Sequence, residues 1–397
     1  MKKSFYLLIV CSICIAFHFL GCKKEVKVSG ISVEVKVSGI SVEPKELYLS
    51  EGDVTQLTCM VKPYGADNKS VTWKSEDISV ATVSATGLVT AIAEGKTQIT
   101  ATTNDGHFTD MVSVMVMSAS TGDSIALVDL HNVATNLPYW DFTKPMEQWE
   151  GVDLNADRRV EYIRGYYDNY WISISKPLNA SIANMNCLKL LFLTNSGYSI
   201  SIPPEIGNLT GLLDLSFKGG FTGTIPPELG NLTKLNQLYL DKNNFTGEIP
   251  KELGNLTQLH TLDLSYNQLT GEIPKELENL KRLNNLYIKN NSLSGTIPKE
   301  LGNIPDLFVL YLTDNLLTGS IPKELGNTNL DVLDLRRNQL TGEIPQELEK
   351  LANSYKLDLR NNSLSGTIPQ ALLNRFGGEA FCPQNGTNFD NLDCSGY

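Results

Sequence analysis

The chain has 397 residues, more than a single hydrophobic core usually organises, so we expect two or three domains. Hydrophobic residues make up 41% and charged residues 19%, which is the composition of a globular protein rather than a disordered one. The net charge of −11 argues against nucleic acid as a partner, because phosphate contacts need a basic patch.

The first 22 residues form a targeting segment. Two lysines precede an apolar run at 5–20, which is too short to span a bilayer comfortably and is typical of a signal peptide. The run ends in Phe-Leu-Gly-Cys at 19–22 and resembles a bacterial lipoprotein signal, although that pattern usually has Leu where Phe19 stands. The resemblance implies that Cys22 becomes the N-terminus and carries lipid, which would anchor the chain to a membrane. The alternatives are a plain secretory signal with an incidental cysteine and an uncleaved anchor.

Three of the seven cysteines lie in residues 1–22, and four lie beyond them: Cys59, Cys187, Cys382 and Cys394. Cys382 and Cys394 enclose a short loop near the C-terminus, and we expect them to form a disulfide, since disulfides persist outside the cytoplasm. Cys59 and Cys187 lie far apart in apolar patterns, which predicts buried free thiols.

A perfect tandem duplication follows the lipid site. The nine residues EVKVSGISV at 25–33 return unchanged at 34–42, each copy with the alternation of a strand. The next domain can use one copy as its first strand, and the other copy is then a spacer or an edge extension. We assign 23–36 to the spacer.

Residues 37–118 read as all-β. Short alternating runs are separated by turn residues, which predicts a small β-sandwich. The stretch VTWKSEDISVATVSATGLVTAIAEGKTQITATT at 71–103 resembles a group 2 bacterial immunoglobulin-like domain, with Trp73, Gly87 and Gly95 where that family has them. The resemblance implies a spacer or adhesive module without catalysis.

The segment 119–187 is predicted to be a linker and a cap. YWDFTKPMEQWEGVDLNADRRVEYI at 139–163 is similar to the N-terminal cap of plant-type leucine-rich-repeat domains. A solenoid needs such a cap because its first coil would otherwise expose apolar side chains.

A period of 23 or 24 residues dominates from 188 to 374, which predicts eight repeats, with a C-terminal cap at 375–397. A Leu-x-x-Leu-x-Leu element recurs with this period, although Ser354 replaces the leading Leu of the last repeat. Each repeat has an Ile-Pro pair, and the prolines are Pro203, Pro226, Pro250, Pro274, Pro298, Pro322, Pro345 and Pro369. The period lies in the leucine-rich-repeat range, and Gly-x-Ile-Pro resembles the plant-specific type. The expected fold is an α/β-type solenoid whose leucine-bearing strands form a parallel concave sheet.

We interpret the residues that recur at the same positions in every repeat as structural. In TGEIPKELGNL at 246–256, Gly and Pro turn the chain and Ile and Leu fill the core, while the Lys-Glu pair is expected on the convex side. One asparagine per repeat is expected to bridge the backbones of adjacent coils, at Asn243, Asn267, Asn291, Asn315, Asn338 and Asn362.

Enzyme motifs are scarce, and we predict no catalytic residue, cofactor or metal. His107, His131 and His260 lie in three different regions, and neither a nucleophile elbow nor a phosphate-binding glycine loop is present in the sequence. The oxygen-rich stretch DLNAD at 153–157 has the spacing of a calcium loop, but Arg158 replaces the sharp-turn glycine. The resemblance to a cap accounts for this stretch without a metal.

Residues that alternate with the core leucines point onto the concave sheet and vary from repeat to repeat. Tyrosines and charged residues there suit protein recognition and would also suit sugar stacking. The predicted ligand-binding residues are Tyr239, Asp263, Tyr287, Lys289, Phe308, Tyr311, Asp334 and Arg336. The competing interpretation is ordinary repeat consensus, with Asp-Arg pairs that only neutralise each other.

The function that follows is binding rather than turnover. We expect a lipid-anchored protein of the bacterial cell envelope, in the outer membrane and surface-exposed, whose concave face recognises or adheres to a host or envelope protein. The alternatives are a passive scaffold, and a protein that binds glycans or inhibits polysaccharide hydrolases, as plant relatives of the repeat suggest.

Overall fold

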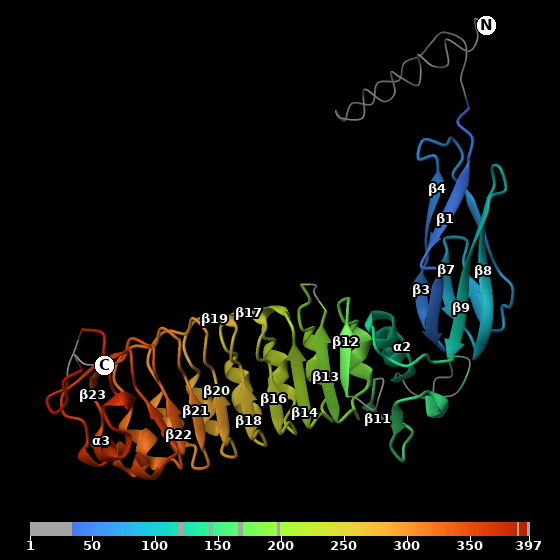
Figure 1. The fold of residues 1–397 in the computed structure, drawn as a ribbon. Helices are drawn as coiled ribbons and strands as arrows, with labels where there is room; N and C mark the ends of the chain where they lie inside the picture. The colour runs from blue at the N-terminus through green and yellow to red at the C-terminus, as the bar shows by residue number, and fades with distance from the viewer. Residues whose placement is uncertain are drawn as a thin grey trace, which may run out of the picture.

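The computed structural model describes residues 34–117, 123–142, 144, 146–165, 170–196, 199–386 and 389–394. They form a β-sandwich and a long solenoid, joined beside helix α2 (Figure 1). The predicted signal peptide, Cys22 and the first nonapeptide copy lie outside the described residues. Within the described residues, no helix has the length and apolar character needed to cross a membrane.

The sandwich contains antiparallel pairs and one parallel pair, β2 with β9. The sheets have the strand orders β2-β9-β8-β5, β3-β7-β6 and β1-β4. The strands are β1 (Gly39–Glu43), β2 (Glu46–Ser50), β3 (Val54–Gln56), β4 (Thr58–Lys62), β5 (Val71–Ser75), β6 (Ala81–Val83), β7 (Leu88–Ala91), β8 (Gly95–Thr103) and β9 (Thr109–Met117).

Alternating side chains of these strands fill the sandwich core. Every second residue of β8 is buried from Thr97 to Thr103, as expected for a strand with one face on the core. Gly87 shows why the motif needs glycine: its φ is +83°, and an added Cβ would lie 2.8 Å from the Trp73 ring. The all-β prediction for this region is confirmed.

The second nonapeptide copy supplies the first strand. β1 pairs antiparallel with β4, and the Val42 side chain is fully buried. The prediction of a buried thiol at Cys59 is wrong, since this free cysteine is exposed, and Cys187 is only partly covered. The chain changes sheets at Leu57, between β3 and β4, and on β4 only Val61 is covered, by Val37 and Ala66.

The N-terminal cap closes the first end of the solenoid. It contains α2 (Asp123–Val133), a 3₁₀ turn (Met146–Gln148) and the hairpin β10 (Val152–Leu154) and β11 (Val160–Ile163). Asp123 is fully buried and accepts hydrogen bonds from Arg159 Nε at 2.9 Å and from the Val160 amide at 2.8 Å. A charge-assisted pair therefore fixes α2 to the hairpin.

Parallel strands of successive coils form the main sheet, nine of them in the described residues. They are β12 (Trp171–Ile174), β13 (Leu190–Asn195), β14 (Asp214–Lys218), β16 (Gln237–Tyr239), β18 (Thr261–Asp263), β20 (Asn285–Tyr287), β21 (Val309–Tyr311), β22 (Val332–Asp334) and β24 (Lys356–Asp358). The sheet begins before the first predicted repeat, because β12 lies in the segment assigned to the cap.

Short strands and 3₁₀ helices form the opposite side of the coils. The strands are β15 (Thr222–Thr224), β17 (Asn244–Gly247), β19 (Gln268–Leu269), β23 (Thr341–Glu343) and β25 (Ser363–Ser365). The helices are Ala180–Asn184, Pro204–Asn208, Pro227–Asn231, Lys251–Asn255, Lys275–Asn279, Lys299–Asn303, Lys323–Asn327 and Gln346–Asn353. A Cβ on Gly254 would lie 2.4 Å from the Glu276 carbonyl oxygen, so this glycine lets adjacent coils approach closely.

The asparagines form the predicted ladder between coils. Asn315 is buried and accepts a hydrogen bond from the Leu293 amide at 3.1 Å in the preceding coil. Its Nδ2 donates to the carbonyl oxygens of Ile288 at 3.0 Å and Leu312 at 3.1 Å. The next ladder residue, Asn338, also donates to the Leu312 oxygen, so one continuous network runs along the solenoid.

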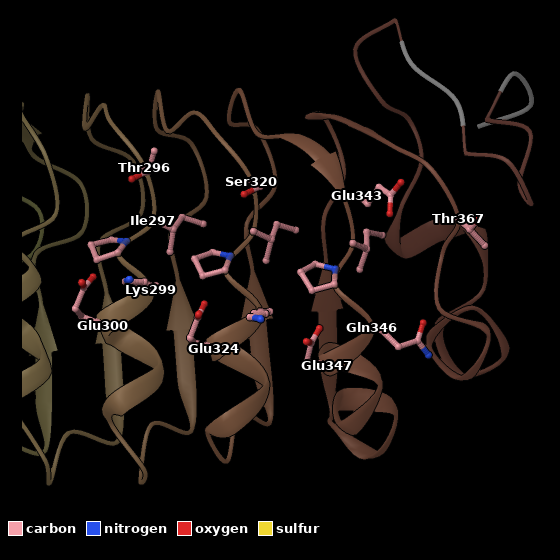
Figure 2. Close-up of a pocket in the computed structure, with 16 residues that line it drawn as sticks. Thr296, Ile297, Lys299, Glu300, Ser320, Glu324, Glu343, Gln346, Glu347 and Thr367 are labelled. Carbon is pink, nitrogen blue, oxygen red and sulfur yellow. The ribbon is translucent and has the colours of Figure 1, made fainter.

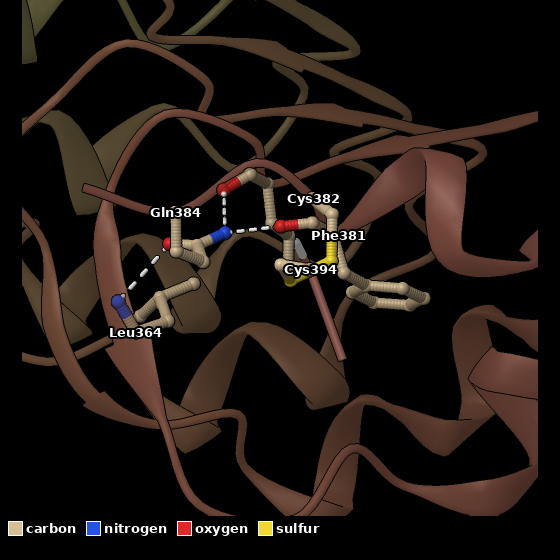
Figure 3. The surroundings of a disulfide bond; sticks show 6 residues. Leu364, Phe381, Cys382, Gln384 and Cys394 are labelled. Atoms are coloured by element: carbon tan, nitrogen blue, oxygen red, sulfur yellow. Dashed lines mark hydrogen bonds between the residues drawn. A yellow bond between two sulfur atoms is a disulfide. The ribbon is translucent and has the colours of Figure 1, made fainter. Parts of the chain in front are cut away.

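The C-terminal cap contains α3 (Gln370–Phe376) and a 3₁₀ turn (Gly378–Ala380). Cys382 and Cys394 form the predicted disulfide, with a Cα–Cα distance of 5.3 Å (Figure 3). Gln384 takes over the role of the ladder asparagine there, because it accepts from the Leu364 amide at 3.1 Å and donates to the Leu359 oxygen at 3.1 Å. The cap therefore satisfies the backbone of the last coil.

An aromatic cluster joins the sandwich to the cap. The Tyr48 ring of β2 packs edge-to-face on Phe142 at 5.2 Å, and Phe142 packs in turn on Trp149 at 5.3 Å. Trp140 is fully buried and stacks on Trp149 at 5.4 Å. Apolar packing at this junction therefore links the two bodies.

Candidate functional site

The candidate site is the sheet face that lies opposite the core leucines, called here the concave face. In the strands from β13 to β24, one aligned leucine per strand is buried, while the residues before and after it project onto this face. The register aligns the central column in chain order as Trp171, Phe192, Ser216, Tyr239, Asp263, Tyr287, Tyr311, Asp334 and Asp358. Five predicted site residues therefore share one column: Tyr239, Asp263, Tyr287, Tyr311 and Asp334.

Two tyrosines at the centre of this face form an aromatic platform. The rings of Tyr287 and Tyr311 stack with centroids 5.6 Å apart and an interplanar angle of 22°. Lys289 Nζ lies 5.3 Å and Lys356 Nζ 5.0 Å from the centroid of Tyr311. Phe308, immediately before β21, is 47% exposed. The platform therefore offers apolar rings with positive charge beside them.

The carboxylates at the C-terminal end of the face belong to a closed ionic network. Asp334 has no exposed surface and pairs with Lys356 at 2.8 Å and with Arg336 at 3.3 Å. Asp358 pairs with Arg360 at 2.7 Å and with Arg336 at 3.4 Å. The hydrogen bond to Asp358 raises the pKa of Arg360, as expected for a guanidinium beside a buried carboxylate. Asp334 thus positions the cations here, and Arg336 is partly accessible.

Carboxylates at the other end are differently placed. Asp263 stands beside Tyr239 on the neighbouring strand, and Asp214 lies diagonally across from the same ring. Burial raises the pKa of the Asp214 carboxyl and also that of Asp263. Burial, and then the nearby carboxylates of Asp214 and Asp263, raise the pKa of the Tyr239 hydroxyl, which donates to Gln237 Oε1 at 2.8 Å. This part of the face, on β14, β16 and β18, is acidic.

Several residues of the face escaped prediction from the sequence. Trp171 on β12 lies beside Phe192 with ring centroids 5.3 Å apart, and Lys218 Nζ lies 5.1 Å from the Trp171 centroid. The alternation Trp-Ile-Ser-Ile at 171–174 could have revealed this strand, but it lacks the leucines of the repeat. Tyr266 and Lys356 were likewise missed, although both lie near predicted residues.

Two grooves lie elsewhere, along the Ile-Pro segments, with volumes of 910 and 940 Å³. Figure 2 shows the first, with Glu300, Glu324 and Glu347 repeating from coil to coil. The second is lined by the same words of the repeat, including Glu248 and Glu272. Because both grooves have consensus residues, their chemistry is the same in successive coils and gives little basis for selecting a partner.

The stretch considered for calcium forms the turn of the β10–β11 hairpin. The Asn155 side chain accepts hydrogen bonds from the Asp157 and Arg159 amides, at 2.9 and 3.0 Å. Asp153 pairs with Arg164 at 2.5 Å. Among the described residues, no group of three or more His, Cys, Asp or Glu side chains is arranged to hold a metal.

Comparison with models of protein families assigns a family to the sandwich and another to the solenoid. The bacterial Ig-like domain (group 2) model matches residues 36–114. The Leucine Rich Repeat model matches residues 234–256, 258–280, 282–304, 306–328, 329–351 and 355–374. This chain joins a group 2 bacterial immunoglobulin-like domain to a leucine-rich-repeat domain. The resemblances inferred from the sequence are therefore confirmed for both domains.

Solved structures similar to the leucine-rich-repeat domain include receptor ectodomains. One is the ectodomain of the plant membrane receptor kinase GASSHO1/SCHENGEN3 from Arabidopsis thaliana, in complex with CASPARIAN STRIP INTEGRITY FACTOR 2. It is 31% identical with a TM-score of 0.57, and the match covers 67% of this chain and 33% of that one. The crystal structure of PEPR1-AtPEP1 is 28% identical with a TM-score of 0.53, and the match covers 67% of this chain and 45% of that one. The leucine-rich-repeat domain thus resembles ligand-binding ectodomains.

Curated relatives match only a short segment of this chain, of the immunoglobulin-like type. A lacto-N-biosidase from Bifidobacterium bifidum is 50% identical over 60 residues, which is 15% of this chain and 5% of the enzyme. An alpha-L-arabinofuranosidase from Bifidobacterium longum is 51% identical over 61 residues, 15% of this chain and 6% of the enzyme. The chain therefore spans about a twentieth of these relatives. Both domains of this chain are of types that typically bind rather than catalyse.

Proposed function

We propose that this protein recognises a protein partner with the concave face of its leucine-rich-repeat domain. The observation that carries the proposal is the platform of Tyr287 and Tyr311, flanked by Lys289, Lys356 and the exposed Phe308. Tyrosine and arginine are enriched among the residues that dominate binding energy in protein interfaces, and Arg336 Nε donates to the hydroxyl of Thr313, two residues after Tyr311, at 3.3 Å. The similarity to ectodomains solved with bound ligands supports the same conclusion.

We further propose that Cys22 carries a lipid that holds the chain in the bacterial envelope, in the outer membrane with the solenoid exposed. The motif Phe-Leu-Gly-Cys at 19–22 supports this location. In Figure 1 the strands β1 and β4 lie at the end of the sandwich far from the solenoid, so the immunoglobulin-like domain would act as a spacer. Metabolic labelling with an alkyne fatty acid should mark the wild type and not Cys22→Ser, and protease shaving of intact cells should release the solenoid. Equal labelling of both proteins, or full resistance to the protease, would contradict this location.

The binding test replaces Tyr287, Tyr311 and Phe308 with Ala in the full mature chain. The matched control replaces Tyr64 and Tyr139, which are 89% and 84% exposed and lie off the concave face. A partner captured by the wild type and by the control should be lost by the platform variant, whose melting temperature should stay close to that of the wild type. A platform variant that keeps the partner, or that unfolds at a much lower temperature, would refute the site.

Two other functions are outcomes of the same test. A glycan array that shows binding dependent on Tyr287 and Tyr311, with no protein captured, would assign sugar capture, since stacked aromatic rings also suit sugars. Capture of neither class would leave a passive envelope scaffold.

A further inference from the structure

We infer that the acidic part of the concave face, on β14, β16 and β18, binds a cationic side chain of the partner, best an arginine. This acidic subsite consists of Asp214, Ser216, Tyr239, Asp241 and Asp263. The inference rests on the proposed function and specifies the chemistry of the partner that the concave face recognises.

The strand register brings these residues together. Ser216 and Asp263 flank Tyr239 in the central column, on the strands to either side, about 5 Å away. Asp241 follows Tyr239 by two residues and therefore projects onto the same face. Asp214 precedes Ser216 by two residues on β14. Four acidic or hydroxyl side chains thus surround one tyrosine ring.

Oxygen atoms of the subsite are buried without a hydrogen-bond partner in the structure. They are Asp214 Oδ1, Ser216 Oγ and Asp241 Oδ1. Ser216 is 1% exposed and Asp241 8% exposed, so these are covered polar groups rather than solvated surface residues. Such groups are destabilising unless they are paired, and a ligand with several N–H donors would pair them once the side chains that cover them rotate aside.

The cations near the subsite neutralise its carboxylates only in part. Lys218 Nζ is 3.9 Å from Asp241 Oδ1, beyond hydrogen-bond distance, and lies over the Trp171 and Tyr239 rings at 5.1 and 5.9 Å. On the far side of the subsite, the Lys289 charge partly offsets the rise in the pKa of Asp263, and Lys289 Nζ lies 5.3 Å from the ring centroids of Tyr266 and Tyr311.

The ionic network at the other end of the same sheet is the internal comparison. There, Asp334 and Asp358 each pair with two cationic side chains at 2.7 to 3.4 Å. The solenoid can therefore neutralise carboxylates on this face with its own lysines and arginines. Among the described residues, the three carboxylates of the acidic subsite have one long ion pair, Lys218 with Asp241 at 3.9 Å, so the subsite can accept a further cation from a partner.

Arginine fits the subsite best among cationic side chains. Its planar guanidinium carries five N–H donors, which can serve carboxylate and hydroxyl oxygens together, and its face stacks on aromatic rings. Tyr239 offers such a ring in the middle of the acceptors. With Lys289 and Lys356 beside the tyrosine platform, the concave face also changes from acidic to basic along the solenoid, which would fix the direction of a bound segment.

The test selects binders from a phage library of random linear peptides on the full mature chain. The wild type should enrich peptides with a recurring arginine, and a selected synthetic peptide should bind Asp214→Asn/Asp241→Asn about tenfold or more weakly, because hydrogen bonds to charged groups are lost. The control Glu248→Gln/Glu272→Gln removes the same charge from the Ile-Pro groove and should bind as the wild type does. Both variants keep side-chain size, and their melting temperatures verify folding.

Each outcome is decisive. Peptides without a recurring basic residue, equal loss in both variants, or a library that yields no binder would overturn the acidic subsite. Arginine peptides that depend on Asp214 and Asp241 but bind Tyr287→Ala/Tyr311→Ala normally would uphold the subsite and remove the platform from the proposed function. Peptides that need Tyr287 and Tyr311 and contain no basic residue would uphold the platform and overturn the acidic subsite.

Discussion

Substitution of a ladder asparagine measures how much the side chains between coils contribute to the solenoid. In Asn315→Ala, the Leu293 amide loses its partner in a buried position. The carbonyls of Ile288 and Leu312 each keep one hydrogen bond, from Asn291 and from Asn338. One orphaned amide costs about 1–3 kcal/mol and two weakened carbonyls add about 1–2 kcal/mol in total, so we expect a loss of roughly 2–5 kcal/mol in the free energy of unfolding.

Urea and thermal unfolding of the full mature chain, followed by circular dichroism, provide the assay. For a domain of this size the loss corresponds to a fall of roughly 5–15 °C in the melting temperature of the solenoid. Asn315→Asp keeps the volume but loses the donors, and it should be at least as damaging. Asn303→Ala removes an exposed asparagine, whose Nδ2 donates to Glu278 at 2.8 Å, and should change stability by less than about 0.5 kcal/mol. A loss below about 1 kcal/mol in Asn315→Ala, or an equal loss in Asn303→Ala, would refute the ladder as a source of stability.

Three further predictions concern the caps and the acidic subsite. Asp123→Ala leaves the Arg159 guanidinium without its buried partner. It should lower the free energy of unfolding by about 3–5 kcal/mol, measured by urea titration. A change within about 0.5 kcal/mol would contradict the buried pair. Cys382→Ser/Cys394→Ser opens a loop with a sequence separation of 12 and should cost about 3 kcal/mol, with no further loss when reductant is added; further loss would mean that another bond is responsible. Asp214→Asn should raise the melting temperature at pH 7, because burial raises the pKa of this carboxyl. A carboxyl with a raised pKa favours folding while it is protonated and loses that contribution as pH rises through the folded pKa. The difference in melting temperature between Asp214→Asn and the wild type should therefore shrink as pH falls toward the ordinary pKa of Asp. A difference that does not depend on pH would refute the raised pKa of Asp214.

The repeat made most of the solenoid readable from the sequence. When coils stack, leucines at a fixed spacing can be buried in only one way. The residues that alternate with them must then face outward, so the central column from Phe192 to Asp358 was predictable from the sequence. The inter-coil role of Asn315 and its equivalents was predictable for the same reason. β12 was not, since Trp171 and its neighbours form a coil strand without the leucine pattern.

Pairing and exposure depended on neighbours that a sequence does not specify. The Leu-x-Cys-x-Val alternation at 57–61 predicted one buried face, but the chain changes sheets at Leu57 and the exposed β4 leaves Cys59 uncovered. Asp214 and Asp334 have the same side chain on the same face, yet only Asp334 has two cations within reach. That distinction depends on the long side chains of adjacent strands, which only the folded structure places.

Because Gln384 takes the place of a ladder asparagine, the C-terminal cap can follow any coil of the ladder, and the solenoid can vary in length. The C-terminal cap meets the last coil through the Leu359 carbonyl and the Leu364 amide, which are backbone groups that each ladder coil presents in the same positions. Insertion or removal of a complete 24-residue unit would therefore leave both ends chemically unchanged. Recombination between near-identical repeats could lengthen or shorten the recognition face in whole steps, and new combinations of surface residues could arise without a new fold.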